Sequence, residues 1–176
     1  MSWEFTVLDA LQKIHTPVFD KLMVCVTSLG NAGWFWIVLG ILLLLTKRYK
    51  KMGILILTAL CFSLLFGNLI LKPLVARERP CWIKESIQLL IAIPKDYSFP
   101  SGHTQASFAS ATAIASVNKR AGIAAFILAG LIAFSRLYLY VHFPTDVMAG
   151  IGIGILCGLL AGMIYKNVLN RVKTGK

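Results

Sequence analysis

The stretch GILILTALCFSLLFGNLIL, residues 53–71, decides the fold, because it is a long apolar run without a charged side chain. A helix rises about 1.5 Å per residue, so about 20 apolar residues cross a hydrocarbon layer roughly 30 Å thick. The sequence therefore predicts a membrane-spanning helix over about 53–75. Further apolar segments that can cross or nearly cross the bilayer lie at about 33–46, 102–117, 121–141 and 145–165.

Composition supports a membrane protein along the whole chain. Of its 176 residues, 57% are hydrophobic and 14% are charged, which is more apolar than a soluble domain of this size needs. We predict an all-α fold: a bundle of about six transmembrane helices that forms one domain over residues 1–176. Segment 3–30 should form an interfacial helix that leads into a less hydrophobic first span. No basic segment precedes an apolar one at the N-terminus, so no cleaved signal peptide is expected.

Two of the apolar segments are distinguished by the number or the spacing of their small residues. Segment 102–117 is short and rich in Ser, Thr and Ala, so we expect an inner helix that the other helices shelter. The last segment carries a glycine every four residues, at Gly150, Gly154, Gly158 and Gly162. This stripe predicts close helix–helix packing, either within the fold or against a second subunit.

Charges are distributed unevenly along the chain. Lys and Arg number 18 and Asp and Glu number 7, which gives a net charge of +11. Segments 47–51 (KRYKK), 118–120 (NKR) and 166–176 are basic and contain no acid. The positive-inside rule places these segments, including the C-terminus, in the cytoplasm. Membrane topology thus explains most of the excess charge, and we predict no binding to nucleic acid.

The opposite face of the predicted bundle carries the first motif, LKPLVARERP, at residues 71–80. Lys72 and Arg79 are seven residues apart, so they can share one face at the end of a span, and Pro80 ends the helix. This pair could form a basic collar that reaches the membrane surface, or it could bind an anion.

The second motif lies in DYSFPSGHTQASFAS, residues 96–110. Pro100 suits the start of a helix, Ser101 is a good N-cap, and Gly102 lets another group approach the backbone. The N–H groups and positive dipole end of a helix N-terminus bind phosphate well, and His103 would lie beside such an anion. The alternative is an ordinary capped helix whose histidine bonds to a loop carbonyl.

The third motif is SRLYLYVHFPTD, residues 135–146. Pro144 favours a helix end near His142 and a new helix start, which places Asp146 in the first turn of the last span. A carboxylate there can hold one imidazole nitrogen and leave the other free as a nucleophile or base. The alternative is a surface ion pair, although Arg136 six residues before His142 favours a functional site.

These three motifs all fall on the same, extracytoplasmic side of the predicted bundle. Three basic groups aimed at one point repel each other unless an anion neutralises them. A phosphoryl group, whose charge is spread over several oxygens, is the natural occupant.

Order and spacing of the motifs resemble the signature of the type 2 phosphatidic acid phosphatase (PAP2) superfamily. The matching elements are Lys72-x6-Arg79-Pro80, Pro100-Ser101-Gly102-His103 and Ser135-Arg136-x5-His142-x3-Asp146. They cover the region 72–146 without a departure from the pattern. The length of the chain suits the compact bacterial membrane branch of this superfamily.

The resemblance implies a role for each motif residue. His142 would attack phosphorus, Asp146 would orient it, and His103 would protonate the leaving oxygen and then activate water. The groups that would hold the phosphoryl oxygens are Lys72, Arg79, Arg136, Ser101 and the Gly102 amide. The resemblance implies no metal and no cofactor. Three nearby charges match no signature position: Arg77, Glu78 and Lys84. They are predicted to be solvated in loops, and the alternative is that they tune substrate binding.

The resemblance therefore implies a multi-pass enzyme of the cell membrane that hydrolyses a lipid phosphate or diphosphate at the extracytoplasmic face. Undecaprenyl diphosphate is the leading candidate substrate, followed by phosphatidylglycerophosphate or phosphatidic acid. A lipid translocator is the alternative from another class, but its polar groups would lie at mid-membrane, often in repeated halves. Vanadate-dependent haloperoxidases share the motifs, but they are larger and soluble.

Overall fold

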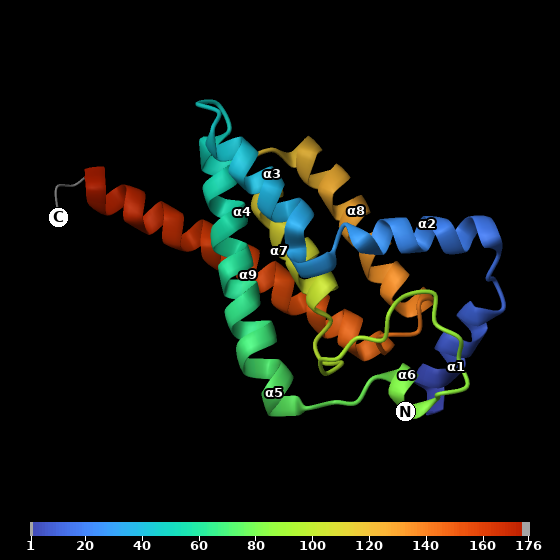
Figure 1. Ribbon diagram of the computed structural model, residues 1–176. Coiled ribbons are helices and arrows are strands. Elements are labelled where there is room, and N and C mark those ends of the chain that lie inside the picture. Colours follow the sequence, from blue (N-terminus) through green and yellow to red (C-terminus); the bar gives the residue numbers. More distant parts are fainter. Residues whose placement is uncertain (1, 174–176) are drawn as a thin grey trace.

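The computed structural model describes residues 2–173, which form helices and connecting loops without a strand (Figure 1). The helices are, in chain order, α1 (Ser2–Gln12), α2 (Pro17–Ser28), the 3₁₀ helix η1 (Asn31–Gly33), α3 (Trp34–Leu44), α4 (Lys50–Ser63), the π-helical η2 (Leu64–Leu71), α5 (Lys72–Val75), α6 (Pro80–Ile83), α7 (Gly102–Ala115), α8 (Lys119–Tyr138) and α9 (Pro144–Lys173). The predicted all-α fold is confirmed for this part of the chain.

Helix α7 lies at the centre of the bundle, in contact with α4, α8 and α9 (Figure 1). Most of its side chains are buried, although many of them are Ser, Thr or Ala. Such small side chains let neighbouring helices approach closely, and some of their hydroxyl groups form hydrogen bonds within the protein. Ser107, for example, accepts a hydrogen bond from the Trp36 indole over 3.0 Å. The prediction of an inner helix is confirmed, and this helix carries His103 in its first turn.

The glycine stripe of α9 explains how closely this helix packs against α7. A Cβ atom added to Gly150, Gly154 or Gly158 would lie less than 3.0 Å from an atom of the segment 101–112. Gly162, in contrast, has no such neighbour within 4 Å. Most of the predicted stripe therefore serves packing within the fold.

Helices α4, η2 and α5 form one continuous rod along the side of the bundle (Figure 1). Gly67 lets the rod approach α7, because a Cβ there would lie only 2.1 Å from Oε1 of Gln105. The rod ends at Ala76, whose left-handed φ of 46° cannot continue a helix. Lys72 is thereby held at the end of the rod, next to the start of α7.

Segment 3–30 forms two helices, α1 and α2, which are separated at residues 13–16. Thr16 caps α2 by accepting a hydrogen bond from the Phe19 N–H, and Pro17 takes the first helical position. Helix α1 packs against α8 and α9. It therefore lies near the loop that joins those two helices.

The predicted count of about six spans is not confirmed. Among the described residues, the helical stretches long and apolar enough to cross a membrane are Lys50–Ile83, Lys119–Tyr138 and Pro144–Val172. The pair Pro17–Ser28 and Asn31–Leu44, bent by 45°, adds a fourth if it forms one span. Helix α7 is not among these stretches, because it has 14 residues, whereas a full crossing needs about 20.

The two ends of the bundle differ in their loops. The short connection 45–49 and the start of α8 lie at one end, and α6 with the start of α9 lies at the other (Figure 1). Helix α9 continues to Lys173, beyond the predicted end of the last span near residue 165. Lys176, which belongs to the predicted cytoplasmic tail, lies outside the described residues.

Candidate active site

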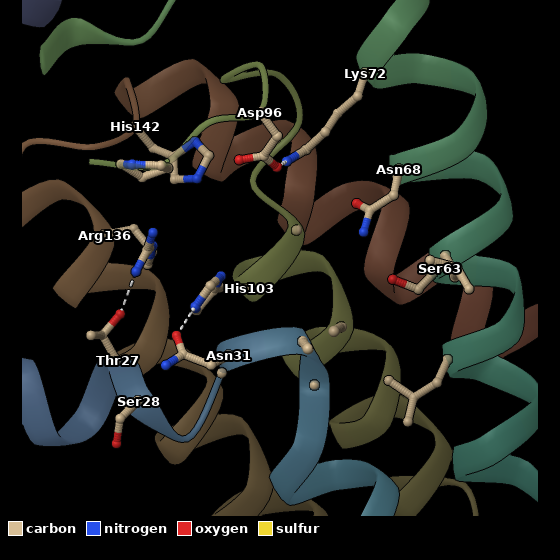
Figure 2. A pocket seen from close by; sticks show the side chains of 18 of the residues that line it. Thr27, Ser28, Asn31, Ser63, Asn68, Lys72, Asp96, His103, Arg136 and His142 are labelled. Atoms are coloured by element: carbon tan, nitrogen blue, oxygen red, sulfur yellow. Dashed lines mark hydrogen bonds and ion pairs between the residues drawn. The ribbon is translucent and has the colours of Figure 1, made fainter. Parts of the chain in front are cut away.

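The three sequence motifs meet at one cavity of about 970 Å³ (Figure 2). Most of the predicted site residues line it: Lys72, Arg79, Gly102, His103, Arg136 and His142. The remaining two, Ser101 and Asp146, are completely buried behind the wall of the cavity. The fold thus brings the ends of α5, α7 and α8 and the α8–α9 loop to one place.

The cavity has a polar part and an apolar part. The cations and histidines lie at helix ends, whereas apolar side chains from α2, α3, α4 and η2 line the rest: Val24, Ile37, Leu57, Leu60 and Leu64. Leu57 lies about 20 Å along the rod from Lys72, at about 1.5 Å per residue. A cavity of this kind can hold a phosphate group and part of an alkyl chain at the same time.

His142 lies in the loop between α8 and α9, with only 1% of its surface exposed. Its Nε2 lies 3.1 Å from Nη1 of Arg79. A guanidinium group only donates, so Nε2 accepts and carries the lone pair. Burial, followed by the charges of Arg79 and Arg136, holds the pKa of His142 well below its ordinary value. The imidazole is therefore neutral at pH 7, as a nucleophile must be.

Asp146, in the first turn of α9, does not make the direct hydrogen bond to His142 that was expected from the sequence. Its Oδ2 lies 3.7 Å from Nδ1 of His142, which is too far for a hydrogen bond, and the two groups form an ion pair only when the ring carries a positive charge. The reason is that Oδ2 already accepts from the Ser98 hydroxyl and the Phe143 N–H. The Ser98 oxygen also lies 3.4 Å from Nδ1, so this hydroxyl links the carboxylate to the imidazole.

Asp96 is a site residue that the sequence interpretation missed. Its carboxylate accepts hydrogen bonds from Lys72 and, over 2.7 Å, from Nη2 of Arg79. Burial alone would raise the pKa of Asp96, but these two cations outweigh it and lower the pKa to about 2. An ionised carboxylate thus already lies between two of the cations that were predicted to hold phosphate.

Arg136 projects from the end of α8 toward the cavity (Figure 2) and is 3% exposed. Its Nη1 donates to the Thr27 hydroxyl over 2.6 Å. Its buried Nε has no hydrogen-bond partner among the residues that the structure describes. Leaving a buried charged donor unpaired is costly, so this guanidinium is suited to receive an anionic ligand.

His103 is held by the segment that precedes α3. Its Nε2 lies 2.9 Å from Oδ1 of Asn31 (Figure 2). Gly30 leaves room for the imidazole, because a Cβ there would lie 2.5 Å from Cδ2 of His103. The expected alternative partner, a loop carbonyl, is thus replaced by a side-chain amide from η1.

Ser101 takes the N-cap position of α7, as predicted, but its hydroxyl does not cap the helix. The hydroxyl pairs with Thr104 over 2.9 Å, and the Ser101 N–H donates to the Asp146 carbonyl oxygen over 3.1 Å. Close packing of α9 on this turn is the reason that Ser101 is buried. Gly102 does line the cavity, and a Cβ there would lie 3.1 Å from Oδ1 of Asn68.

Arg77 was predicted to be a solvated loop charge, and this prediction is wrong. Its side chain is only 16% exposed and donates to Asp146 over 2.6 Å. The left-handed turn at Ala76 redirects the chain after α5, which lets residue 77 point inward. Glu78 is exposed, as expected for a solvated charge, whereas Lys84 is 40% exposed and forms an ion pair with Asp9 over 2.8 Å.

Cysteines and carboxylates do not gather around the cavity as a metal site requires. Within residues 2–173, no group of three or more His, Cys, Asp or Glu is placed to hold a metal ion. All four cysteines are free thiols. Catalysis without a metal stays a prediction.

Comparison with known proteins agrees with this geometry. The sequence pattern of the PAP2 superfamily matches residues 52–169. An undecaprenyl-diphosphatase of Sulfolobus acidocaldarius is 35% identical over 132 residues, which cover 74% of this chain and 63% of that protein. A lipid A 4'-phosphatase of Bacteroides thetaiotaomicron is 30% identical over 173 residues, which cover 92% of this chain and 76% of that protein. The crystal structure of LpxE from Aquifex aeolicus matches with a TM-score of 0.80 at 28% identity, over 92% of this chain and 95% of that one.

These comparisons test the predictions at the level of family and fold. The chain spans just under two thirds of the Sulfolobus protein, but it covers most of the other two. All three motifs lie within the matched residues 52–169, and the predicted enzyme class agrees with the names of the relatives. The similar solved structure supports the membrane helix bundle. The chain therefore belongs to the PAP2 superfamily.

Proposed function

We propose that this chain is a membrane lipid phosphatase that acts through a phosphohistidine at His142. One observation carries the proposal: a single cavity is lined at one part by two histidines and three cations and elsewhere by apolar side chains. A lipid phosphate has the same division into a charged head and an apolar tail. Such a substrate can keep its tail in the bilayer while its head reaches the polar part.

In the first step, Nε2 of His142 attacks phosphorus, a P–N bond forms, and the bond from phosphorus to the leaving oxygen breaks. Lys72, Arg79 and Arg136 hold the phosphoryl oxygens and stabilise the charge that spreads over them. His103 gives a proton to the leaving oxygen, so the leaving group departs protonated.

In the second step, a water molecule attacks the same phosphorus atom. His103, which has lost its proton, now accepts one from this water. The P–N bond breaks, its electron pair returns to the His142 ring, and inorganic phosphate is released. Asp146 stabilises the positive charge that the phosphorylated ring carries between the two steps.

Undecaprenyl diphosphate is the substrate we favour, with undecaprenyl phosphate and inorganic phosphate as products. The supporting observation is the 35% identity to a protein named undecaprenyl-diphosphatase. Phosphatidylglycerophosphate or phosphatidic acid is the alternative. The similarity to a lipid A 4'-phosphatase adds a phosphorylated glycolipid to the compounds worth testing.

The cavity is further proposed to face the extracytoplasmic side of the cell membrane. Support comes from the basic segments 47–51 and 118–120, which lie at the end of the bundle away from α6 (Figure 1). Such basic segments stay in the cytoplasm under the positive-inside rule.

The test is phosphate release by the protein purified in detergent, with EDTA present throughout. The substrates are undecaprenyl diphosphate, phosphatidylglycerophosphate, phosphatidic acid and lipid A. His142→Ala is the inactive variant, and His15→Ala, which changes a histidine that does not line the cavity, is its matched control. Release that persists in EDTA and disappears only in His142→Ala supports the proposal. Equal activity in both variants, or no release from any lipid, overturns it and favours a translocator.

A further inference from the structure

Arg77 is a largely buried cation that lies within the first motif region but occupies none of the signature positions. Its Nη1 donates to Oδ1 of Asp146 over 2.6 Å and to the Thr145 hydroxyl over 2.7 Å. Its Nη2 donates to Oε2 of Glu4 over 2.7 Å. The guanidinium carbon also lies 4.1 Å from the centre of the Phe143 ring. Both terminal nitrogens of this guanidinium are therefore held, and Nη1 holds the carboxylate behind His142.

Glu4 brings the N-terminal helix α1 into this arrangement. Its side chain is 5% exposed, and its other oxygen accepts from the Thr145 hydroxyl over 2.6 Å. A carboxylate this buried needs a charged or hydrogen-bonding partner, and Arg77 and Thr145 supply both. Helix α1 lies outside the residues 52–169 that match the superfamily. The contact is thus an addition to the signature site.

We propose that Arg77 and Glu4 are positioning residues for the His142–Asp146 pair, an inference that rests on the function proposed above. Asp146 is completely buried, and Arg77 occupies its Oδ1. The carboxylate can then present only Oδ2 to Ser98 and to the imidazole. Glu4 fixes the guanidinium in turn, so the orientation of the nucleophile depends on a residue of α1.

Glu4 also determines the charge behind the nucleophile. An Arg77–Asp146 pair alone is neutral, whereas the group of Glu4, Arg77 and Asp146 carries one net negative charge. The His142 ring becomes positive when it bonds to phosphorus, so a net negative charge stabilises the intermediate. Loss of Glu4 should slow formation of the phosphohistidine without a direct effect on lipid binding.

Helix α1 has a second, independent attachment to the same loop. Leu8 packs with Tyr140 and Phe143, and the Tyr140 hydroxyl donates to Asp9 over 2.7 Å. Removing the charge of Glu4 therefore leaves α1 docked. This makes Glu4→Gln a suitable test even if a change at Arg77 prevents folding.

The experiment compares Arg77→Gln and Glu4→Gln with Lys84→Gln. Lys84 also joins the segment after α5 to α1, through two contacts of 2.8 and 2.9 Å to Asp9, but it does not touch Asp146. Steady-state kinetics on the preferred lipid and the single-turnover rate of phosphohistidine formation are measured for each variant. Arg77→Gln is also combined with Asp146→Asn.

If Arg77 and Glu4 position the His142–Asp146 pair, both Arg77→Gln and Glu4→Gln should lower kcat while KM changes little. The decrease for Arg77→Gln should be about 10- to 100-fold. Lys84→Gln should keep the wild-type kcat. The double variant should be no slower than Asp146→Asn alone, because Arg77 acts only through the Asp146 carboxylate, which Asp146→Asn has already removed. If Arg77→Gln does not fold, the Glu4→Gln result decides.

Wild-type kcat in both Arg77→Gln and Glu4→Gln, with His142→Ala inactive, overturns the positioning role but leaves the proposed function intact. A full additive loss in the double variant also overturns it. A wild-type protein that releases no phosphate from any lipid overturns both proposals.

Discussion

Asp96 and Arg79 are joined twice: the guanidinium donates to the carboxylate and to the backbone carbonyl oxygen of Asp96, each over 2.7 Å. The same carboxylate accepts from Lys72. The Asp96 side chain is 57% exposed, so little packing holds it in place. A substrate phosphate must therefore displace an internal anion, or share two cations with it, before it can bind.

Asp96→Asn should strengthen binding of inorganic phosphate, the product of the proposed reaction. Asparagine leaves Lys72 and Arg79 without a competing negative charge. Because the carboxylate is more than half exposed, we expect a modest effect, about a three- to fivefold lower inhibition constant for phosphate. Product inhibition of lipid hydrolysis measures it directly.

Glu85→Gln is the matched control, since Glu85 is an exposed carboxylate of the same loop. The inhibition constant of phosphate for Glu85→Gln should equal that for the wild type.

The pKa of Asp96 is lowered to about 2, so the carboxylate stays ionised at every pH above that value. Its ion pairs weaken only as the pH falls toward 2, so the charge that Asp96→Asn removes is present in full at both pH 5.5 and pH 8. An unchanged or higher inhibition constant of phosphate for Asp96→Asn would show that the Asp96 carboxylate does not compete with phosphate for Lys72 and Arg79.

His142 should make the protein sensitive to mild acid. Its pKa in the folded protein lies well below the ordinary value of about 6.5, so the unfolded chain binds a proton that the folded one excludes. The stability from the neutral imidazole is present above about pH 6.5 and decreases below it, by at most about 1.4 kcal/mol per pH unit. Thermal unfolding in detergent at pH 7 and pH 5 should show a larger decrease in Tm for the wild type than for His142→Gln. Equal decreases in Tm for the two proteins would show that His142 does not cause the sensitivity to acid.

Glycine positions on α9 offer a paired test of packing. Gly154→Ala places a methyl group 2.5 Å from a carbonyl oxygen of α7, so the free energy of unfolding should fall by about 1–3 kcal/mol. Gly162→Ala meets no atom within 4 Å and should be neutral or slightly stabilising, because alanine favours the helix. The two Tm values, measured in the same detergent, give the comparison. Similar shifts at both positions would show that the stripe does not determine this packing.

The motif residues could be predicted from the sequence because each of them lies at or near a helix end. Proline and glycine mark those ends in Arg79-Pro80, Ser101-Gly102 and Pro144, and hydropathy determines which side of the membrane they reach. Local signals of this kind do not depend on how the helices pack. The same holds for the inner position of α7, which follows from its small side chains.

The supporting residues could not be predicted, because their roles depend on contacts between distant segments. Arg77 and Glu4 are separated by most of the α1–α5 region, and nothing local to either residue indicates the other. In the sequence, nothing distinguishes Asp96 from other acidic loop residues, and only the fold shows that it lies next to Lys72. The number of spans stays a prediction, because apolar composition alone does not separate a full crossing from a short enclosed helix such as α7.

Asn31 should be needed for the proton transfers assigned to His103. The Asn31 amide is the side-chain partner of His103 Nε2, and Gly30 leaves just enough room for the ring beside it. Asn31→Ala frees the imidazole to rotate, so kcat should fall by about tenfold or more while KM changes little.

Asn68→Ala is the matched control, because Asn68 also lines the cavity but has no bond to His103. It should retain the wild-type kcat, and any change should appear in KM. A substrate whose leaving group needs no protonation, such as a phosphate ester of an acidic phenol, should hide the effect of Asn31→Ala on the rate of phosphohistidine formation, whereas the later attack of water, which also uses His103, should still be slowed. If Asn31→Ala slows phosphohistidine formation equally with both kinds of substrate, the amide supports the shape of the cavity and does not act through His103 as the acid.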